Sequence, residues 1–135
     1  MGIGLLRAGA DEATWETDLP QAQAAAKAAN KSVLLDFTGS DWCGWCIKLK
    51  AEVFSKPEFV DYAKKNLVLV EVDFPRKKKL NAAQKKANAA LAANYKIEGY
   101  PTVIVLNSEG KKVGELSYQE GGPAAFIASL EKLKK

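Results

Sequence analysis

The 135-residue sequence contains no histidine. Three kinds of site need that residue and are therefore excluded: a hydrolase site that pairs cysteine with a histidine base, a zinc site of mixed cysteine and histidine ligands, and a c-type haem attachment site. Cysteine is almost as scarce, because Cys43 and Cys46 are the only two in the chain. Two thiols fall short of the four ligands of a structural zinc site, so we expect neither a metal nor another cofactor.

Long hydrophobic runs and a strong charge imbalance are also absent. No stretch approaches the roughly 18 consecutive apolar residues of a membrane-spanning helix, so we expect no membrane insertion of the mature domain. Lys and Arg number 20 against 16 Asp and Glu, and the basic residues are scattered through helix-like segments rather than gathered with aromatic residues. That distribution is typical of a solvated surface and argues against a nucleic-acid partner.

The length of the chain bounds the number of domains. At 135 residues, with 47% hydrophobic positions, it is long enough for one domain with a core and too short for two. We expect a flexible N-terminal segment at 1–13 and a single, monomeric domain at 14–135. Ala8, Gly9 and Ala10 follow the small-x-small pattern of a signal-peptidase site, although most of an export signal is missing. The first segment is therefore either the remnant of a trimmed signal or a disordered tail.

Hydrophobic periodicity and turn residues predict an alternation of helices and strands. Short β-branched and aromatic runs indicate strands, and alanine-rich stretches or apolar residues at helical spacing indicate helices. In chain order we expect a helix at 19–30, a strand at 32–38, a helix after 43, a short helix at 57–65, a strand at 66–74, a helix at 76–95, a hairpin of strands at 101–107 and 111–118, and a helix at 124–135. This order predicts an α/β fold with a central mixed sheet, parallel strands followed by an antiparallel C-terminal hairpin, and helices on both faces.

The helix expected at 76–95 is rich in Lys, Ala, Asn and Gln. Its apolar residues recur on one stripe, which we expect to be buried: Leu80, Ala83, Ala87, Ala90 and Leu91. We interpret its lysines as a solvated outer face rather than as a binding patch.

Cys43 and Cys46 stand in the stretch DWCGWC, where a predicted strand gives way to a helix. A thiol with a pKa of about 8.5 is only about 3% ionised at neutral pH, and the thiolate is the form that reacts. Backbone N–H groups and the dipole at the start of a helix stabilise the anion. We therefore expect Cys43 to be an exposed nucleophile and Cys46, one turn further into the helix, to be a screened resolving thiol.

Two readings without redox chemistry remain for the cysteine pair. It is a passive disulfide staple, or it is half of a metal site completed by another molecule. A staple across so short a loop removes little chain entropy, and zinc needs four ligands. Thiol–disulfide exchange is therefore the favoured function.

Two separated stretches resemble one known family. LLDFTGSDWCGWC resembles the active-site strand and loop of thioredoxin-fold proteins, and GYPTVIVLNSEGK resembles the segment that carries the cis-proline of that family. The likeness runs from about Lys31 to the C-terminus. WCGWC, the extended FTGSDW loop and the helical insertion before the Tyr-Pro-Thr stretch resemble bacterial thioredoxin-like thiol:disulfide interchange proteins, many of them exported. A likeness to small disulfide isomerases of the secretory pathway is also visible.

The resemblance implies a surface on which substrates dock. Pro101 would follow a cis peptide bond, and the main chain of Tyr100 would hydrogen-bond an extended segment of the substrate. A trans proline that merely starts a strand is the alternative. Trp42 matches the tryptophan that the family keeps before its first cysteine and would line the same surface. We expect Gly44 and Trp45 there as well, although Trp45 stands where thioredoxins have a proline and the oxidising isomerases a histidine.

Asp36 falls where the family keeps a buried carboxylate that exchanges a proton with the resolving thiol. The neighbouring strand, LVLVEVD, lacks the lysine that thioredoxins proper place there, and one extra residue separates Asp36 from the cysteine motif. A buried Asp36 without a cationic partner should have a raised pKa, which suits a base for Cys46. The alternative is that the longer loop turns Asp36 away and leaves it to cap local backbone.

The resemblance also implies a function. It is that of a protein-disulfide oxidoreductase, a reductase or an isomerase, whose partners are protein thiols and disulfides and an upstream redox protein. A noncatalytic binding module and an electron-relay domain for cytochrome or metal-centre maturation remain alternatives. The subfamily likeness and the small-x-small pattern favour a periplasmic or secreted location over the cytoplasm.

Overall fold

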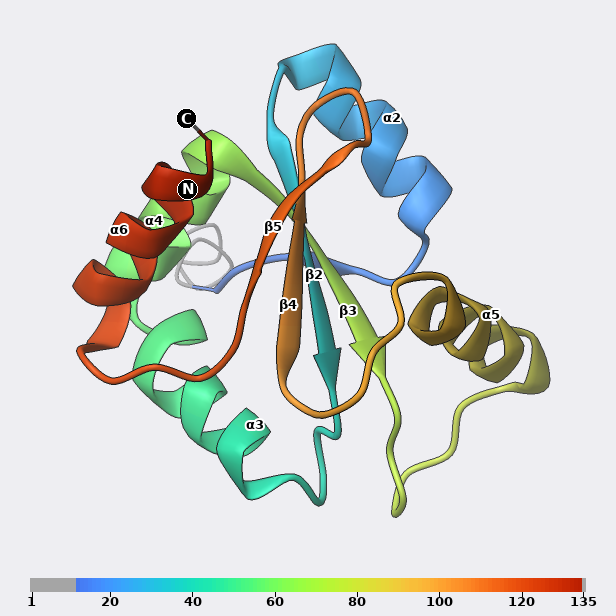
Figure 1. Ribbon diagram of the computed structural model, residues 1–135. Helices are drawn as coiled ribbons and strands as arrows, with labels where there is room; N and C mark the ends of the chain where they lie inside the picture. The colour runs from blue at the N-terminus through green and yellow to red at the C-terminus, as the bar shows by residue number, and fades with distance from the viewer. Residues whose placement is uncertain (1–11, 135) are drawn as a thin grey trace, which may run out of the picture.

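A five-stranded mixed sheet forms the centre of the protein (Figure 1). The computed structural model describes residues 12–134. The strands lie in the order β1-β3-β2-β4-β5, and their bounds are β1 (Trp15–Glu16), β2 (Ser32–Thr38), β3 (Leu67–Asp73), β4 (Thr102–Leu106) and β5 (Lys112–Leu116). β1, β3 and β2 are parallel, β4 is antiparallel to β2, and β5 is antiparallel to β4. The predicted mixed sheet with a C-terminal hairpin is confirmed, and β1 is an additional strand too short for a sequence pattern to indicate.

Helices cover both faces of the sheet (Figure 1). They are α2 (Leu19–Ala29), α3 (Gly44–Leu49), the π-helical segment η1 (Lys50–Phe54), α4 (Pro57–Asn66), α5 (Ala82–Asn94) and α6 (Gly122–Leu133). The helices α3, α4 and α6 lie with η1 on one face, and α2 and α5 lie on the other. The start of α3 and the loop between β3 and α5 meet at the carboxyl ends of β2 and β3.

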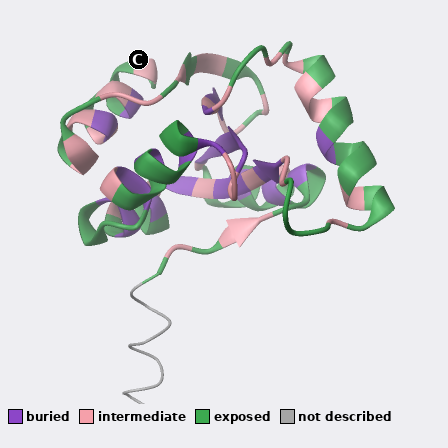
Figure 2. Cartoon of the chain, turned by 90° about the horizontal axis from the view of Figure 1, so that it is seen from below, coloured by how far each residue is buried: buried purple, intermediate pink, exposed green. Residues whose placement is uncertain are grey.

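The strand β2 is buried along its whole length because helices cover it from both sides. Leu34 belongs to a core cluster with Phe126 on the face of α3 and α6, whereas Leu35 and Phe37 belong to the cluster on the face of α2. Figure 2 shows the buried residues gathered on the central strands and the inward sides of the helices. Alternation along the strand places Asp36 on the same face as Leu34, which is the face beneath α3.

The helix α5 begins later than predicted. Its first residue is Ala82, and Asn81 caps it by accepting the backbone N–H of Gln84 at 2.8 Å. Residues 76–80 form a loop instead of helical turns, because the backbone N–H groups of 76–78 bond to the carboxylate of Asp41. The basic residues of this loop therefore lie at the carboxyl end of the sheet and not on a helix surface.

The predicted buried stripe of α5 is wrong for its alanines, whereas Leu91 is half-buried and packs against the core cluster on the face of α2. Ala83, Ala87 and Ala90 are exposed, and the buried residue of this helix is Asn88. The Nδ2 of Asn88 donates to the backbone carbonyl of Asp73, at the end of β3, with a distance of 2.9 Å. Alanine buries little apolar surface, whereas Asn88 satisfies a buried backbone acceptor, so this hydrogen bond and the packing of Leu91 together decided the inward face of the helix.

The predicted N-terminal segment at 1–13 lies outside the described residues, apart from Glu12 and Ala13. The limits of the single domain stay a prediction. Across residues 12–134, no helix combines the length and the apolar character that crossing a membrane requires.

Candidate active site

Cys43 and Cys46 form a disulfide at the start of α3, with their Cα atoms 5.2 Å apart. Cys43 is the N-cap of the helix, and its Sγ accepts the backbone N–H of Cys46 at 3.2 Å. The backbone N–H of Cys43 donates to the carbonyl oxygen of Gly39 at 2.9 Å. The predicted junction of strand and helix is confirmed, and a helix N–H points at the sulfur of Cys43.

The two cysteines are almost equally buried: 7% of the surface of Cys43 and 5% of that of Cys46 is exposed. The prediction of an exposed Cys43 above a screened Cys46 is therefore wrong for this oxidised state, because each sulfur of a disulfide covers part of the other. Position in the helix distinguishes the two residues instead. Cys43 precedes the helix, and Cys46 lies within its first turn.

Trp42 is held against the end of β3. Its Nε1 donates to the backbone carbonyl of Phe74 at 2.7 Å. The same edge of the ring approaches buried Gly39, where a Cβ would lie within 2.6 Å of three ring atoms, Nε1 among them. A residue with a side chain does not fit there without a shift, so Gly39 and Phe74 together fix Trp42 next to Cys43.

An aromatic cluster of Trp42, Phe74 and Tyr100 joins three loops. The ring centroids of Trp42 and Tyr100 are 5.9 Å apart, and those of Phe74 and Tyr100 are 5.4 Å apart. The peptide bond between Tyr100 and Pro101 is cis, as the family resemblance predicted. The hydroxyl of Ser117 donates to the carbonyl of Pro101 at 2.7 Å. The Tyr100 and Pro101 segment is thus anchored beside the cysteine loop.

Asp36 is buried beneath α3, with 8% of its surface exposed. Its Oδ1 has no hydrogen-bond partner among the residues that the structure describes. Burial raises the pKa of Asp36 to about 8, and the negative charges of Glu71 and Asp73 add to the rise. The direction agrees with the raised pKa that was expected for this carboxyl group.

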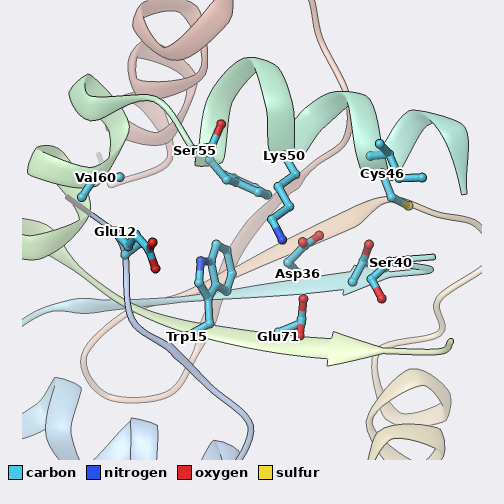
Figure 3. Close-up of a pocket in the computed structure, with 13 residues that line it drawn as sticks. Glu12, Trp15, Asp36, Ser40, Cys46, Lys50, Ser55, Val60 and Glu71 are labelled. Atoms are coloured by element: carbon cyan, nitrogen blue, oxygen red, sulfur yellow. The ribbon is translucent and has the colours of Figure 1, made fainter. Parts of the chain in front are cut away.

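A pocket of about 490 Å³ has Cys46, Asp36 and Trp15 among its lining residues. Figure 3 shows Lys50 extending from the helix towards Asp36, with Glu71 on the neighbouring strand. The charge of Lys50 lowers the pKa of Asp36, although the effect of burial is larger. The positive side chain that β3 lacks is therefore provided by Lys50 of the helix. Because Asp36 and Cys46 line one pocket, the longer loop has not turned Asp36 away.

Gly44 and Trp45 form the outer side of the cysteine motif. Trp45 is 57% exposed, and its ring lies 5.0 Å from that of Tyr118 between centroids. The Nζ of Lys48 lies 5.2 Å from the centre of the Trp45 ring. Gly44 is exposed, and a Cβ at its position would have no atom within 4 Å. Both residues therefore offer open surface next to the disulfide.

Asp41 and Asp73 organise the loops around the cysteines, and no sequence pattern indicated a role for either. Asp41 accepts the backbone N–H groups of residues 76–78, each at 2.9 Å, and these hydrogen bonds lower its pKa. Asp73 accepts the backbone N–H of Ser40 at 2.9 Å and its hydroxyl at 2.5 Å. Both aspartates bridge segments that are distant in the chain, which local patterns do not reveal.

Lys50 and Glu71 are further site residues that the sequence reasoning missed. A signal existed for Glu71, because it shares one side of β3 with buried Leu67 and Leu69 and so places a charge on an apolar face. Nothing marks Lys50, which is one exposed basic residue among many. Only the packing of the helix over the sheet brings Lys50 to Asp36.

Comparison with known proteins identifies the family. Residues 19–134 match the family described as thioredoxin-like domain. The chain is 36% identical over 121 residues to the disulfide bond reductase DsbH of Chlamydia pneumoniae. The aligned region covers 90% of this chain and 72% of that protein. It is 34% identical over 93 residues to the thiol:disulfide interchange protein DsbD of Klebsiella pneumoniae, covering 69% of this chain and 14% of that protein. A solved structure of DsbH oxidoreductase has a TM-score of 0.85 at 35% identity, over 90% of this chain and 84% of that one.

The chain belongs to the thioredoxin-like family. With a Cys43–Cys46 disulfide at the start of a helix, and with oxidoreductases as its relatives, it is a protein thiol:disulfide oxidoreductase. The predicted family, fold and enzyme class are confirmed.

Proposed function

We propose that this protein reduces disulfide bonds in protein substrates, with Cys43 as the nucleophile and Cys46 as the resolving thiol. The observation that carries the proposal is the N–H of Cys46 directed at the Sγ of Cys43 in the first turn of α3. The likeness to the disulfide bond reductase DsbH supports the reductive direction.

The reaction begins with both thiols reduced. The Cys43 thiolate attacks one sulfur of the substrate disulfide, forms a mixed disulfide with it and expels the other sulfur, which takes up a proton. The Cys46 thiolate then attacks the Sγ of Cys43 and expels the remaining substrate sulfur. The products are a reduced substrate and a Cys43–Cys46 disulfide, which is the form of the present structure.

The Cys43 thiolate must be stabilised for the first step. Half-ionisation at pH 7 requires about 2 kcal/mol, because a free thiol has a pKa of about 8.5. The helix dipole contributes only about 0.3 to 1 kcal/mol. We assign the remainder to the directed N–H of Cys46, since a hydrogen bond to a charged acceptor contributes about 1.5 to 3 kcal/mol. These two contributions suffice without a histidine.

Asp36 takes the proton from the Cys46 thiol before the second step. It lines the same pocket as Cys46, and its Oδ1 forms no hydrogen bond with any residue that the structure describes. Burial raises the pKa of Asp36 to about 8, close to that of an ordinary thiol. Groups of similar pKa exchange a proton with little change in free energy, so the ionised fraction of Asp36, which grows as pH approaches 8, suits this role.

The substrate docks on the surface formed by Trp42, Gly44, Trp45, Tyr100 and Pro101. The main chain of Tyr100 pairs with an extended substrate segment, a mode of recognition that accepts many sequences. The exposed ring of Trp45 adds apolar contact, and Gly44 leaves open space next to the cysteine pair.

The partners follow from the two half-reactions. Protein disulfides accept electrons from the dithiol, and an upstream redox protein returns electrons to the Cys43–Cys46 disulfide. The likeness to DsbH and to the thioredoxin-related protein DsbJ of Chlamydia pneumoniae supports a periplasmic or secreted location. We expect the protein to act as a monomer.

Reduction of insulin disulfides by dithiothreitol tests the proposed function. The protein should catalyse this reaction, and Cys43→Ser should abolish turnover. Cys46→Ser should instead accumulate a mixed disulfide, because the attack that releases the substrate is missing. Unchanged turnover in Cys43→Ser would overturn the proposal. A binding module that uses the disulfide only as a lock would show no turnover and would keep its partner after both cysteines are replaced by serine.

Equilibration with glutathione tests the direction of electron flow. A reduction potential of about −270 mV is that of a reductant, and one of about −120 mV is that of an oxidant. We expect a value close to the first. A value close to the second would contradict the reductive direction but would remain consistent with thiol–disulfide exchange.

Electron relay within a larger assembly is a second candidate function. The match to 14% of the length of DsbD favours it, because the similar region is there one part of a longer thiol:disulfide interchange protein. A relay domain should exchange rapidly with one redox protein and slowly with insulin, so a comparison of the two rates separates the candidates.

A further inference from the structure

Four consecutive basic residues, at 76–79, lie beside the redox site. They occupy the loop between β3 and α5, which meets the start of α3 at the carboxyl end of the sheet (Figure 1). All four are exposed. In a helix these charges would be an ordinary solvated face, but the loop places them next to the surface that a substrate must approach.

The cysteine loop itself holds these residues in place. The carboxylate of Asp41, two positions before Cys43, accepts the backbone N–H groups of Arg76, Lys77 and Lys78 at 2.9 Å each. The guanidinium carbon of Arg76 lies 3.8 Å from the centre of the Trp42 ring, a stacked cation–π contact. The position of the basic residues relative to the sulfurs is therefore defined by contacts and not left to a free loop.

The positive charge of this region is incompletely neutralised. The acids that contact it are Asp41, whose charge interacts with Lys77, and Asp73, which lies 3.3 Å from the Nζ of Lys78. Their two negative charges face the five positive charges of residues 76–79 and Lys85. Lys79 and Lys85 form no ion pair with any residue between 12 and 134. Both line a pocket of about 360 Å³, together with Arg76, Lys78, Asp73, Asn88 and neighbouring residues of the loop.

We propose that Arg76, Lys77, Lys79 and Lys85, here termed the basic rim, bind acidic side chains that a protein substrate or redox partner carries close to its reacting disulfide. The inference rests on the proposed function and adds the charge class of the partner. The basic rim adjoins Trp42, which lines the docking surface, so a protein that delivers a disulfide to Cys43 must pass it. That placement favours an acidic protein over a nucleic acid as the ligand.

The exposure of the basic rim limits how strongly it can bind an acidic partner. Exposed ion pairs are weak and are screened over about 8 to 10 Å at physiological salt, so the rim should act mainly on the rate of encounter. The preference for acidic partners should therefore appear in kcat/KM at low ionic strength and fade at high salt. Two lysines together should change kcat/KM by about 3- to 10-fold.

Three disulfide-containing peptides, alike except for the residues that flank one cysteine, provide the substrates. The flanking residues are aspartate, serine or lysine. The test variant is Lys79→Gln with Lys85→Gln, which removes two charges from the rim. The matched control is Lys27→Gln with Lys65→Gln, which removes two exposed charges near the opposite, amino ends of β2 and β3. kcat/KM is measured for each protein and peptide at low and at high salt.

The natural protein should prefer the aspartate peptide at low salt, and the rim variant should lose about 3- to 10-fold in kcat/KM for that peptide alone. The control variant should keep the preference. Equal losses for the aspartate and serine peptides, or equal losses in rim and control variants, would overturn the proposal. So would a rim-dependent affinity for a single-stranded oligonucleotide or for anionic lipid vesicles without any peptide preference.

The serine peptide separates this inference from the proposed function. If the natural protein reduces it but shows no charge preference, the basic rim proposal fails alone. If no peptide is reduced, the proposed function fails and the inference falls with it.

Discussion

Asp36 on β2 lies directly opposite Glu71 on the parallel strand β3, and both side chains line the pocket beneath α3. The negative charge of Glu71 raises the pKa of Asp36, and the positive charge of Lys50 lowers it. Burial raises the pKa of Glu71 as well. The titrations of the two acids are therefore coupled, and the charge of Lys50 acts on both of them.

Asp36→Asn should stabilise the protein by an amount that grows with pH. Folding shifts the pKa of Asp36 from the ordinary value of 3.8 to about 8, so the folded protein holds a proton that the unfolded chain releases. The stability of the natural protein should fall as pH rises between these two values and level off above the second. Because asparagine does not titrate, the gain in the variant should widen over the same window to a few kcal/mol.

Urea denaturation at a series of pH values measures this difference. Asp61→Asn, at an exposed position of α4, is the matched control and should show no such widening. A gain in Asp36→Asn that is the same at acid and alkaline pH would show that Asp36 ionises normally in the folded protein.

Glu71→Gln and Lys50→Met should move the pKa of Asp36 in opposite directions. Glu71→Gln removes a negative charge and should lower it, whereas Lys50→Met removes a positive charge and should raise it. The carboxyl chemical shift of Asp36, followed by NMR through a pH titration, reports the midpoint directly. Midpoints that coincide in both variants and the natural protein would mean that neither charge reaches Asp36.

Gly39→Ala should destabilise the protein and displace Trp42. A methyl group at this position would overlap the Trp42 ring, and overpacking of this kind costs about 1 to 3 kcal/mol. Turnover of disulfides should fall as well, because the loop that carries Cys43 shifts with the ring. Tryptophan fluorescence and urea denaturation measure the two effects. Gly99→Ala, where a Cβ meets no atom within 4 Å, serves as control and should be nearly neutral.

Asp41→Ala should release the loop between β3 and α5. The three backbone N–H groups at 76–78 would lose their acceptor, so their hydrogen exchange should accelerate relative to amides elsewhere. The same bonds lower the pKa of Asp41, so its contribution to stability should be complete above the ordinary value of 3.8 and be lost as pH falls through the lowered one. Exchange rates at 76–78 that match those of the natural protein would refute this account of the loop.

The cysteine site was predictable to the extent that its geometry is local. Cys43 and Cys46 lie within one turn, and a buried strand followed by turn residues places them at a helix start, as the structure has it. The cis bond before Pro101 was predictable from a resemblance and not from physics, because X-Pro bonds of both forms occur in folded proteins.

The inward face of α5 shows why other features were not predictable. Hydrophobicity favoured a stripe of alanines, but the end of β3 presents a backbone carbonyl that only a polar donor satisfies, and Asn88 takes that place. The partner of Asn88 is known only when the helix is docked. Hydrogen bonds between distant segments leave no periodic trace in a sequence.

The sequence by itself determined the chemistry of this protein, since one pair of thiols without any histidine allows disulfide exchange and little else. It also determined the alternation of strands and helices, because apolar periodicity and turn residues are local properties. The tertiary structure alone decided which charges surround Asp36 and which loop lies beside Trp42. Those relationships depend on strand register and on helix packing, which bring together residues whose separation in the chain carries no information about their contact.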